Sequence, residues 1–299
     1  MAERKILLIV NQTAKHGVAE ALTPVIERLL HSVPHDTVCT THPGHAAELA
    51  EAAEGYEAVI AVGGDGTVHE VVNGIMRRPE GSRPAFGLIP TGSGNDSRRT
   101  LGIPGDVSDA ALLLASGTRR RFDVGVCNGT YFSNSFAAGL DARVTATAVE
   151  FKVTTRRSGL WLYLTALLHV LFHELKPQRV TLCWEGVTTE ERDVLIVAAT
   201  IGKTYGGGFF ITPDAVPDDG LLDTCIIDPL TLPQALARLP FVVAGKHTRM
   251  KPVHMVQARS LVIDSGEPLP AQMDGEVAVG CHFEISILPQ ALECIVPRT

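Results

Sequence analysis

A glycine-rich segment with a single carboxylate is the first candidate for chemistry in this sequence. Residues 63–67 (GGDGT) directly follow an apolar run, residues 58–62, and precede a helical pattern. Glycine lets a backbone turn sharply and come close to a ligand. Amide groups at a helix start attract phosphates, and Asp65 beside them could hold a hydrated Mg²⁺ against a nucleotide. The segment therefore predicts a nucleotide-phosphate loop.

The residues that follow carry a helix-start signal. Thr67 and Glu70 have the spacing of a capping box, which predicts a helix that begins at Thr67. A purely structural interpretation is that the glycines serve tight packing and that Thr67 and Glu70 cap each other. An acidic residue among three glycines after a buried strand favours a ligand site, because α/β sheets bind ligands at that end of their strands.

A second loop, residues 90–96 (PTGSGND), also follows an apolar run. The hydroxyl of Thr91 or Ser93 could donate to a phosphate, and Asn95 and Asp96 could fix the loop or orient metal-bound water. A turn that caps the next segment explains Asp96 equally well, so we expect a supporting role for it. Two such loops predict one crevice between neighbouring strands.

The elements that must position these loops change in character near Asp123. Before it, short apolar runs alternate with longer amphipathic ones, which is typical of βαβ units around a parallel sheet. After it, strand-like runs are interrupted by helical segments at residues 160–175 and 232–244. We expect an α/β nucleotide-binding domain, a parallel sheet flanked by helices, and then a mainly antiparallel, β-rich, sandwich-like domain. The expected strands are residues 6–10, 37–40, 58–62, 86–89, 123–127, 132–137, 179–184, 194–200, 222–227, 256–264 and 283–288, and the expected helices of the first part are residues 19–30, 46–53, 68–76 and 107–115.

Four motifs are spread over almost the whole chain. They are residues 63–75 (GGDGTVHEVVNGI), residues 90–96 with Arg99 and residues 101–103, the glycines at 206–208 with Pro213, Ala215 and residues 218–223, and the DGE triplet at 274–276. In sequence and order these motifs resemble the catalytic domain shared by diacylglycerol kinases, sphingosine and ceramide kinases and soluble bacterial lipid kinases.

The resemblance implies a two-domain kinase that binds ATP. Residues 1–123, with about 289–299 returning, would form the ATP-binding domain, and residues 124–288 the lipid-substrate domain. By motif, Asn11 and Thr40 would touch the nucleotide, and Ser93 would replace a threonine that is common in the family. The residues around the phosphates would be Gly64, Asp65, Gly66, Thr67 and Glu70.

The DGE triplet would supply the base that phosphoryl transfer requires. Asp274 and Glu276 both fit this role by type, and as alternate residues they could line one cleft and hold each other's pKa apart. We expect Glu276 to be the base, Asp274 to assist or bind metal, and Asp65 to complete the catalytic set. A polar turn between two strands is the alternative interpretation of the triplet.

The acidic segment 218–220 is typical of a turn with a solvated tip, although its oxygen atoms would also suit Mg²⁺ or Ca²⁺. The resemblance implies a structural cation held by Asp219 and by the backbone oxygens of Val216 and Leu221. The helical segment 160–175 is expected to pack or to form an interface, and the preceding Arg156 and Arg157 could touch anionic lipid headgroups.

Composition limits the classes of partner. The 299 residues carry 26 Lys+Arg and 33 Asp+Glu, a net charge of −7, so non-specific binding of nucleic acid is not expected. Six scattered cysteines without a CxxC pair are typical of a reducing cytoplasm. The apolar runs 6–10 and 160–172 are too short to be a secretory or membrane-spanning segment. We expect a cytoplasmic protein that binds transiently at the inner face of the membrane; its oligomeric state is open, with a homodimer as one alternative.

We therefore expect an ATP-dependent, Mg²⁺-requiring lipid kinase that phosphorylates a lipid hydroxyl, with diacylglycerol as the first candidate. An NAD kinase or a phosphofructokinase is the alternative enzyme, because both share a GGDG-type loop. The second loop, the acidic turn and the DGE triplet argue against these. A protein that binds nucleotide or lipid without catalysis is the alternative from another class.

Overall fold

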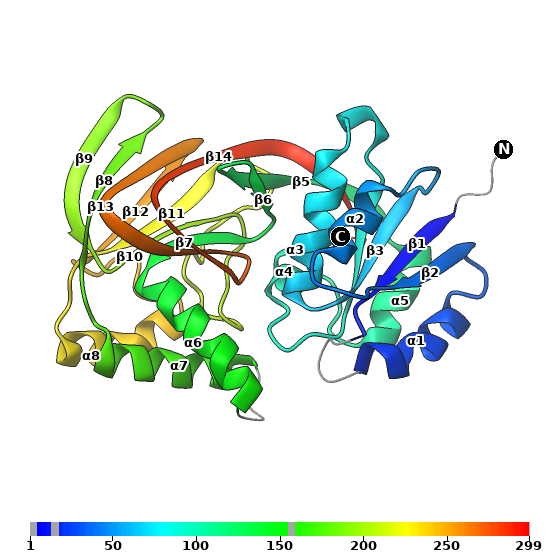
Figure 1. Cartoon of the computed structure of the whole chain (residues 1–299), viewed down its shortest axis with the longest axis horizontal. Coiled ribbons are helices and arrows are strands. Elements are labelled where there is room, and N and C mark those ends of the chain that lie inside the picture. The colour runs from blue at the N-terminus through cyan, green and yellow to red at the C-terminus, as the bar shows by residue number, and fades with distance from the viewer. Residues whose placement is uncertain (1–4, 13–17, 155–158, 299) are drawn as a thin grey trace. The chain divides into compact units, whose positions relative to one another are not determined.

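The computed structural model describes residues 5–12, 18–154 and 159–298, so Arg156 and Arg157 lie outside the described residues. The chain divides into two compact units (Figure 1). The first unit comprises residues 1–123 and 290–299, and the second unit comprises residues 124–289. Among the described helices, none is long and apolar enough to cross a bilayer.

The first unit contains a parallel sheet in the order β2-β1-β3-β4, with the last residues of β14 beside β4. Apolar side chains make β1, β3 and β4 buried along their whole length. Helices α1 and α5 contribute Ile26 and Ala111 to the core on one face, and α2 and α3 pack on the other (Figure 1). The elements are β1 (Ile6–Val10), α1 (Val18–Leu29), β2 (His35–Cys39), α2 (His45–Glu51), β3 (Ala58–Gly63), α3 (Asp65–Arg77), η2 (Glu80–Ser82), β4 (Ala85–Pro90), α4 (Asp96–Thr100), α5 (Val107–Ser116) and β5 (Thr118–Cys127), which continues into the second unit.

The second unit contains an antiparallel sheet in the order β12-β11-β10-β7-β13-β14, and the β8–β9 hairpin extends it from β13. The second unit has a large apolar core, which includes Phe132, Phe136 and Phe283. The elements are β6 (Thr130–Phe132), β7 (Ser135–Gly139), α6 (Leu140–Thr154), α7 (Gly159–His173), β8 (Gln178–Trp184), β9 (Thr188–Val194), β10 (Ile196–Thr200), β11 (Leu222–Ile227), α8 (Leu232–Val243), β12 (Val253–Ala258), β13 (Ser260–Met273) and β14 (Glu276–Val296).

The predicted fold class, a parallel α/β part followed by a mainly antiparallel β part, is confirmed by these sheets. The sequence interpretation missed helix α6. Val144, Thr145 and Thr147 give this helix β-branched residues that are typical of strands. Packing of Leu140 and Val144 against α7 and α8 stabilises the helix in spite of that composition.

Candidate functional site

The first part of the site is the carboxyl edge of the parallel sheet. The strand registers place Val10 opposite both Cys39 and Val62, and Gly63 opposite Pro90. The residues that follow these strand ends therefore lie along one edge, which is where parallel sheets bind ligands. The predicted residues brought to this edge are Asn11, Thr40, Gly64, Asp65, Gly66, Thr67, Ser93, Asn95 and Asp96.

The two glycine-rich loops pack against each other without side chains between them. The amide of Thr91 donates to the carbonyl of Gly63 at 2.9 Å. A Cβ atom on Gly92 would collide with the Cα atom of Gly64, and one on Gly94 would lie 2.7 Å from Oδ2 of Asp65. Glycine is therefore required at position 92, where the neighbour is backbone, whereas a side chain at position 94 would displace the Asp65 carboxylate.

Helix α3 begins at Asp65, not at Thr67, and the predicted capping box is wrong. Gly64 is the N-cap and makes the turn, so the helix starts two residues earlier. Thr67 Oγ1 instead accepts from Asn11 Nδ2 at 3.0 Å, which ties the end of β1 to the first turn of α3. Glu70 lies one turn further along and accepts from the amides of Gly44 at 2.9 Å and Ala46 at 3.0 Å. Glu70 thus caps helix α2.

Asp65 connects the first loop to the second. Its Oδ1 accepts from the amide of Ser97 at 3.2 Å and from the Ser97 hydroxyl at 3.3 Å. Because it is also the first residue of the thirteen-residue helix α3, it stands among amides that have no partner within the helix. The arrangement provides backbone donors for a phosphate and one fixed carboxylate beside them.

The second loop is held by its own polar residues. Asn95, at a positive φ of 54°, donates to the carbonyl of Gly92 at 3.0 Å. Asp96 accepts from Arg99 at 2.7 Å, and the same guanidinium group donates to the carbonyl of Gly94 at 2.8 Å. The half-buried Ser93 hydroxyl has no hydrogen-bond partner among the described residues. Asn95 and Asp96 therefore shape the loop and leave Ser93 available to a ligand.

The DGE triplet forms the turn between β13 and β14. Met273 pairs with Glu276, and the two residues between them have positive φ angles, 49° at Asp274 and 97° at Gly275, as a two-residue hairpin requires. Asp274 is buried and accepts from three backbone amides, those of Ser133, Asn134 and Ser135, at 2.7 to 3.0 Å. Glu276 is exposed.

The structure distinguishes the two carboxylates by burial and by hydrogen bonding. The triplet is a hairpin turn, so the strand alternation on which the expectation of one shared cleft rested does not apply to it. The Asp274 carboxylate holds the segment that leads into β7, whereas Glu276 is accessible at the start of β14.

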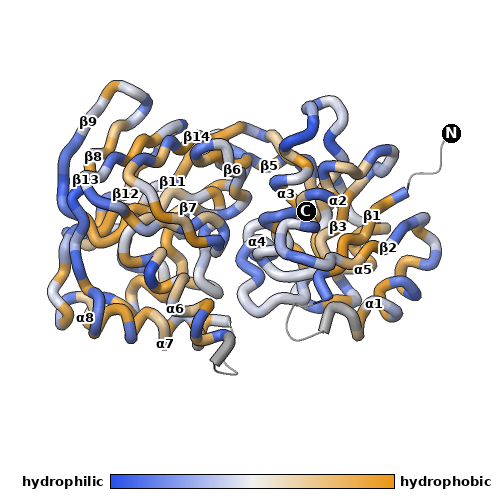
Figure 2. The backbone as a smooth tube through the Cα atoms, viewed as in Figure 1, coloured by the Kyte–Doolittle hydropathy of each residue, from blue (hydrophilic) through white to orange (hydrophobic). Residues whose placement is uncertain are grey.

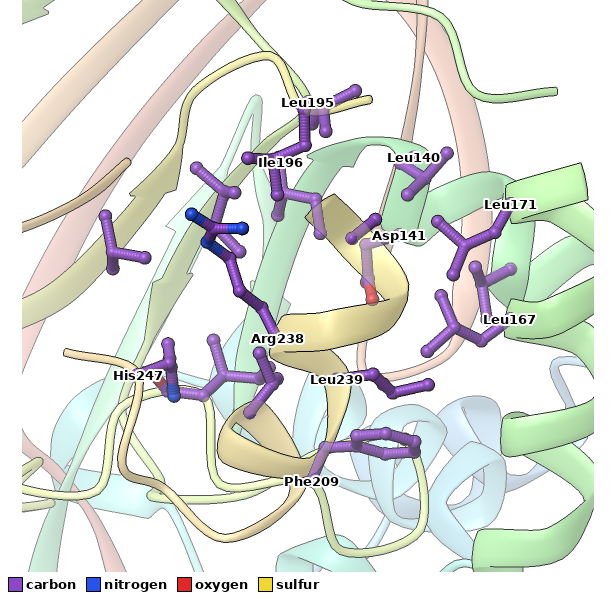
Figure 3. A pocket seen from close by; sticks show the side chains of 18 of the residues that line it. Leu140, Asp141, Leu167, Leu171, Leu195, Ile196, Phe209, Arg238, Leu239 and His247 are labelled. Atoms are coloured by element: carbon purple, nitrogen blue, oxygen red, sulfur yellow. The ribbon is translucent and has the colours of Figure 1, made fainter. Parts of the chain in front are cut away.

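An apolar cavity in the second unit was not predicted from the sequence. It lies between the sheet and helices α6, α7 and α8, and the carboxyl group of Asp141 enters it among leucine and isoleucine side chains (Figure 3). Burial raises the pKa of Asp141 to about 7, although hydrogen bonds to Gln272 and Tyr205 partly oppose this shift. The lining includes Leu140, Tyr163, Leu167, Leu171, Leu195, Ile196, Tyr205, Phe209, Arg238, Leu239 and His247.

One buried side chain links this cavity to the DGE turn. Gln272 donates to Oδ2 of Asp141 at 3.3 Å and accepts from the amide of Gly275 at 2.8 Å. The acidic end of the cavity is thus one side chain away from the turn that carries Glu276. The signal for Asp141 in the sequence was a single acid directly after the apolar run 135–140, which resembles no motif by itself.

Near the acidic turn before β11, Asp219 and Asp214 lie close enough to Asp223 for their charges to act on it. Asp219 is exposed, and its Oδ1 accepts from the amide of Leu221 at 3.0 Å. The pKa of Asp223 is raised to about 6, mainly by burial and also by the charges of Asp219 and Asp214, while a hydrogen bond from Gln257 opposes the shift. Carboxylates that repel one another in this way, with backbone carbonyls nearby, suit a hard cation.

A different side-chain group has the geometry closest to a metal site among the described residues. Ligand atoms of His42, His45 and Glu48 lie within 4.8 Å of one another. However, Nδ1 of His45 accepts from the amide of Thr41 at 3.1 Å, so its other nitrogen carries the proton. Because that nitrogen has no free lone pair, this arrangement does not favour a metal.

Comparison with known proteins agrees with this architecture. Residues 5–127 match the family "Diacylglycerol kinase catalytic domain", and residues 134–296 match "YegS C-terminal NAD kinase beta sandwich-like domain". The diacylglycerol kinase of Bacillus subtilis (strain 168) is 28% identical over 99% of this chain and 97% of its own length. A protein of Enterobacter sp. (strain 638) named "Probable lipid kinase YegS-like" is 32% identical over 86% of this chain and 85% of its own.

Solved structures agree as well. A diacylglycerol kinase from Bacillus anthracis str. Sterne superposes with a TM-score of 0.73 at 23% identity, covering 99% of this chain and 98% of the other. An NAD kinase from Archaeoglobus fulgidus, solved with ATP, has a TM-score of 0.55 at 14% identity over 98% of this chain and 93% of its own, which shows a shared fold alone.

The family matches place this architecture, a parallel sheet with glycine-rich loops followed by a sandwich-like unit, in the class of lipid kinases. The chain belongs to the family of diacylglycerol kinases and YegS-like lipid kinases, for which ATP is the implied co-substrate.

Proposed function

We propose that this protein transfers the γ-phosphoryl group of ATP to a lipid hydroxyl, that of diacylglycerol in the first instance. The observation that carries the proposal is the apolar cavity whose acidic end is joined by Gln272 to the DGE turn. An acyl chain would lie among the apolar side chains, and a hydroxyl at its head would meet a carboxylate. Because its pKa is about 7, Asp141 would be present near neutral pH both as the protonated acid and as the carboxylate. Either form could make a hydrogen bond to the hydroxyl of the lipid head.

The nucleotide would bind at the carboxyl edge of the first unit. Asn11 and Thr40 would contact it, the amides of Gly64, Gly66 and Thr67 would surround its phosphates, and Ser93 would donate its unpaired hydroxyl. Asn95 and Asp96 would keep the second loop in shape. Glu70 would act only indirectly, because its carboxylate already caps helix α2.

The residues around Asp65 fit a hydrated Mg²⁺, because a fixed carboxylate stands beside the hydroxyl of Ser97. When bound, the ion would neutralise charge on the transferred phosphoryl group. Asp65 would hold it while keeping the two glycine loops together. A separate cation at Asp219, with the carbonyls of Val216 and Leu221, would stabilise the second unit and take no part in transfer.

Glu276 would be the general base. It is exposed and next to the turn that contacts Gln272, whereas three backbone amides occupy the Asp274 carboxylate. Asp274 would therefore position the turn that carries the base. Removing the proton of the lipid hydroxyl as the phosphoryl group arrives is a step for which a free carboxylate is suited.

Glu276→Gln tests the proposal. It keeps the size of the side chain and removes its basicity, so kcat should fall about 10²- to 10⁴-fold with little change in ATP affinity. Phosphorylation of diacylglycerol in mixed micelles and ATP titration by calorimetry would measure the two effects. Glu284→Gln, an exposed glutamate on the same strand, is the matched control. Full kcat in Glu276→Gln, or label passing from ATP to NAD and to no lipid, would contradict the proposal.

A further inference from the structure

Helix α7 has an unusual composition for a helix on the outside of a protein. Its fifteen residues, Gly159–His173, include no Asp, Glu, Lys or Arg. Apolar residues recur along its whole length (Figure 2). A helix that is apolar all round is normally covered on all sides, and α7 is covered on one side only.

The uncovered side is centred on one line of residues, with the exposed His169 and His173 beside it. Leu162, Ala166 and Val170 face the protein and are buried, whereas Trp161 and Phe172 have exposed fractions of 72% and 59%. Thr165 and Leu168 lie between these two residues in the sequence. The four positions are separated by four, three and four residues, so their side chains lie along one face of the helix. We refer to Trp161, Thr165, Leu168 and Phe172 as the α7 ridge.

Two of the polar groups on or next to this ridge are bonded within the helix. The Thr165 hydroxyl donates to the carbonyls of Trp161 at 2.9 Å and Leu162 at 2.8 Å. Nδ1 of His173 lies 2.8 Å from the carbonyl of His169. These two groups would therefore need no water on entering an apolar medium. The indole N–H of Trp161 and the exposed ring of His169 would stay at the level of the headgroups, where hydrogen-bond partners are present.

The opposite face of the same helix lines the cavity. Tyr163, Leu167 and Leu171 of α7 contribute to the lining, and the two leucines project toward Asp141 in the same view (Figure 3). We propose that the α7 ridge docks this protein on a lipid bilayer, so that one helix separates the membrane from the cavity. This inference rests on the proposed function, because it treats the cavity as the place of an acyl chain.

The size of the ridge favours a bilayer over a second copy of the chain. At about 200 Å² for an aromatic side chain, the exposed fractions of Trp161 and Phe172 leave roughly 250 Å² of aromatic surface in water. A stable protein interface needs about 800 Å² on each partner. Aromatic side chains lie readily at the boundary between headgroups and acyl chains, and there they need no matched partner surface.

Trp161 itself can report the contact, because the chain has only two tryptophans. In a Trp184→Phe background, vesicles of equal parts phosphatidylcholine and phosphatidylglycerol should shift the Trp161 emission to the blue, and brominated acyl chains should quench it. Absence of both effects would overturn the proposal. A blue shift that increases with protein concentration in the absence of vesicles would also overturn the proposal, because it would show that a second copy of the chain covers the α7 ridge.

Flotation with the same vesicles tests the whole ridge. Trp161→Ser with Phe172→Ser should weaken vesicle binding at least about tenfold, whereas Val187→Ser with Val279→Ser, which removes exposed apolar side chains elsewhere in the second unit, should not. Unchanged flotation of the ridge variant would refute the docking proposal. The wild type and both double variants should phosphorylate a short-chain, monomeric diacylglycerol at the same rate. If none of the three proteins phosphorylates it while flotation differs as expected, the proposed function is wrong and the docking proposal is still supported.

Discussion

The carboxylates of this protein differ in function according to the donors around them. Glu70 and Asp274 accept hydrogen bonds from backbone amides, which fixes helix α2 and the segment before β7. Asp141 lies in an apolar cavity, where burial shifts its pKa upward. Glu276 is exposed at the end of a turn. Residue type alone therefore does not separate a structural acid from one available for proton transfer; the number of occupied acceptor sites does.

Asp65→Asn tests the first loop. The amide oxygen can still accept from Ser97, so the loops should stay together and the melting temperature should change little. The charge is lost, so kcat/KM for ATP should fall about 10²- to 10³-fold, a magnitude typical of losing one electrostatic contact in a transition state. Steady-state kinetics over a range of Mg²⁺ would measure it. Asp109→Asn, which neutralises an exposed carboxylate of the same unit, serves as the control. Wild-type Mg²⁺ dependence in Asp65→Asn would rule out the metal-holding role.

Asp141→Asn tests the polar end of the cavity through its pH dependence. Since the folded pKa of about 7 lies above the ordinary aspartate value of 3.8, the folded state binds more protons than the unfolded state between these two pH values. The free energy of unfolding of the wild-type protein should therefore fall as pH rises from 4 to 7, by up to about 1.4 kcal/mol per pH unit. Above pH 7 this group should cause no further loss. The variant lacks this loss. The difference in free energy of unfolding between the variant and the wild type should increase from pH 5 to pH 7 and then stay constant. A difference that does not vary with pH would contradict the raised pKa of Asp141.

At the level of elements, the sequence predicted what depends on local pattern. The strand before each glycine loop and the helix after the first one follow from the order of apolar runs and turn residues. The start of α3 was misplaced because Gly64 can serve as N-cap without a side chain, and Glu70 finds its partners in α2, 24 and 26 residues away. The cavity was missed for the same reason, since Asp141 and Gln272 meet across 131 residues of sequence. Contacts of this kind leave no local pattern.

Gly92→Ala tests the contact between the two glycine loops. The added Cβ would collide with the backbone of Gly64, which cannot move aside as a flexible side chain can. The loops should separate, and ATP affinity measured by calorimetry should fall at least about tenfold. Gly81→Ala is the matched control, because its Cβ would meet nothing within 4 Å. Equal ATP affinity in both variants would show that the nucleotide does not depend on this contact.

At the level of the whole molecule, each unit has its own core and its own candidate site. The first unit has glycine-rich loops at the edge of a parallel sheet, and the second unit contains the apolar cavity and the acidic turn. The separation means that a ligand of one unit should stabilise mainly that unit, since binding raises the stability only of the structure that binds. The structural cation proposed at the acidic turn is the clearest instance, because no transfer step depends on it.

Removal of that cation should destabilise the second unit. A ligand at about a hundred times its dissociation constant adds about 2.7 kcal/mol, which for a unit of this size corresponds to roughly 5–10 °C in melting temperature. A chelator should therefore lower the melting temperature by this amount in wild type and in Asp109→Ala, an exposed carboxylate of the first unit, but not in Asp219→Ala. The effect should shrink at pH 5, because Asp223, with its pKa raised to about 6, then takes up a proton and relieves the repulsion that the ion would neutralise. A chelator shift that is undiminished in Asp219→Ala would place the ion elsewhere in the molecule.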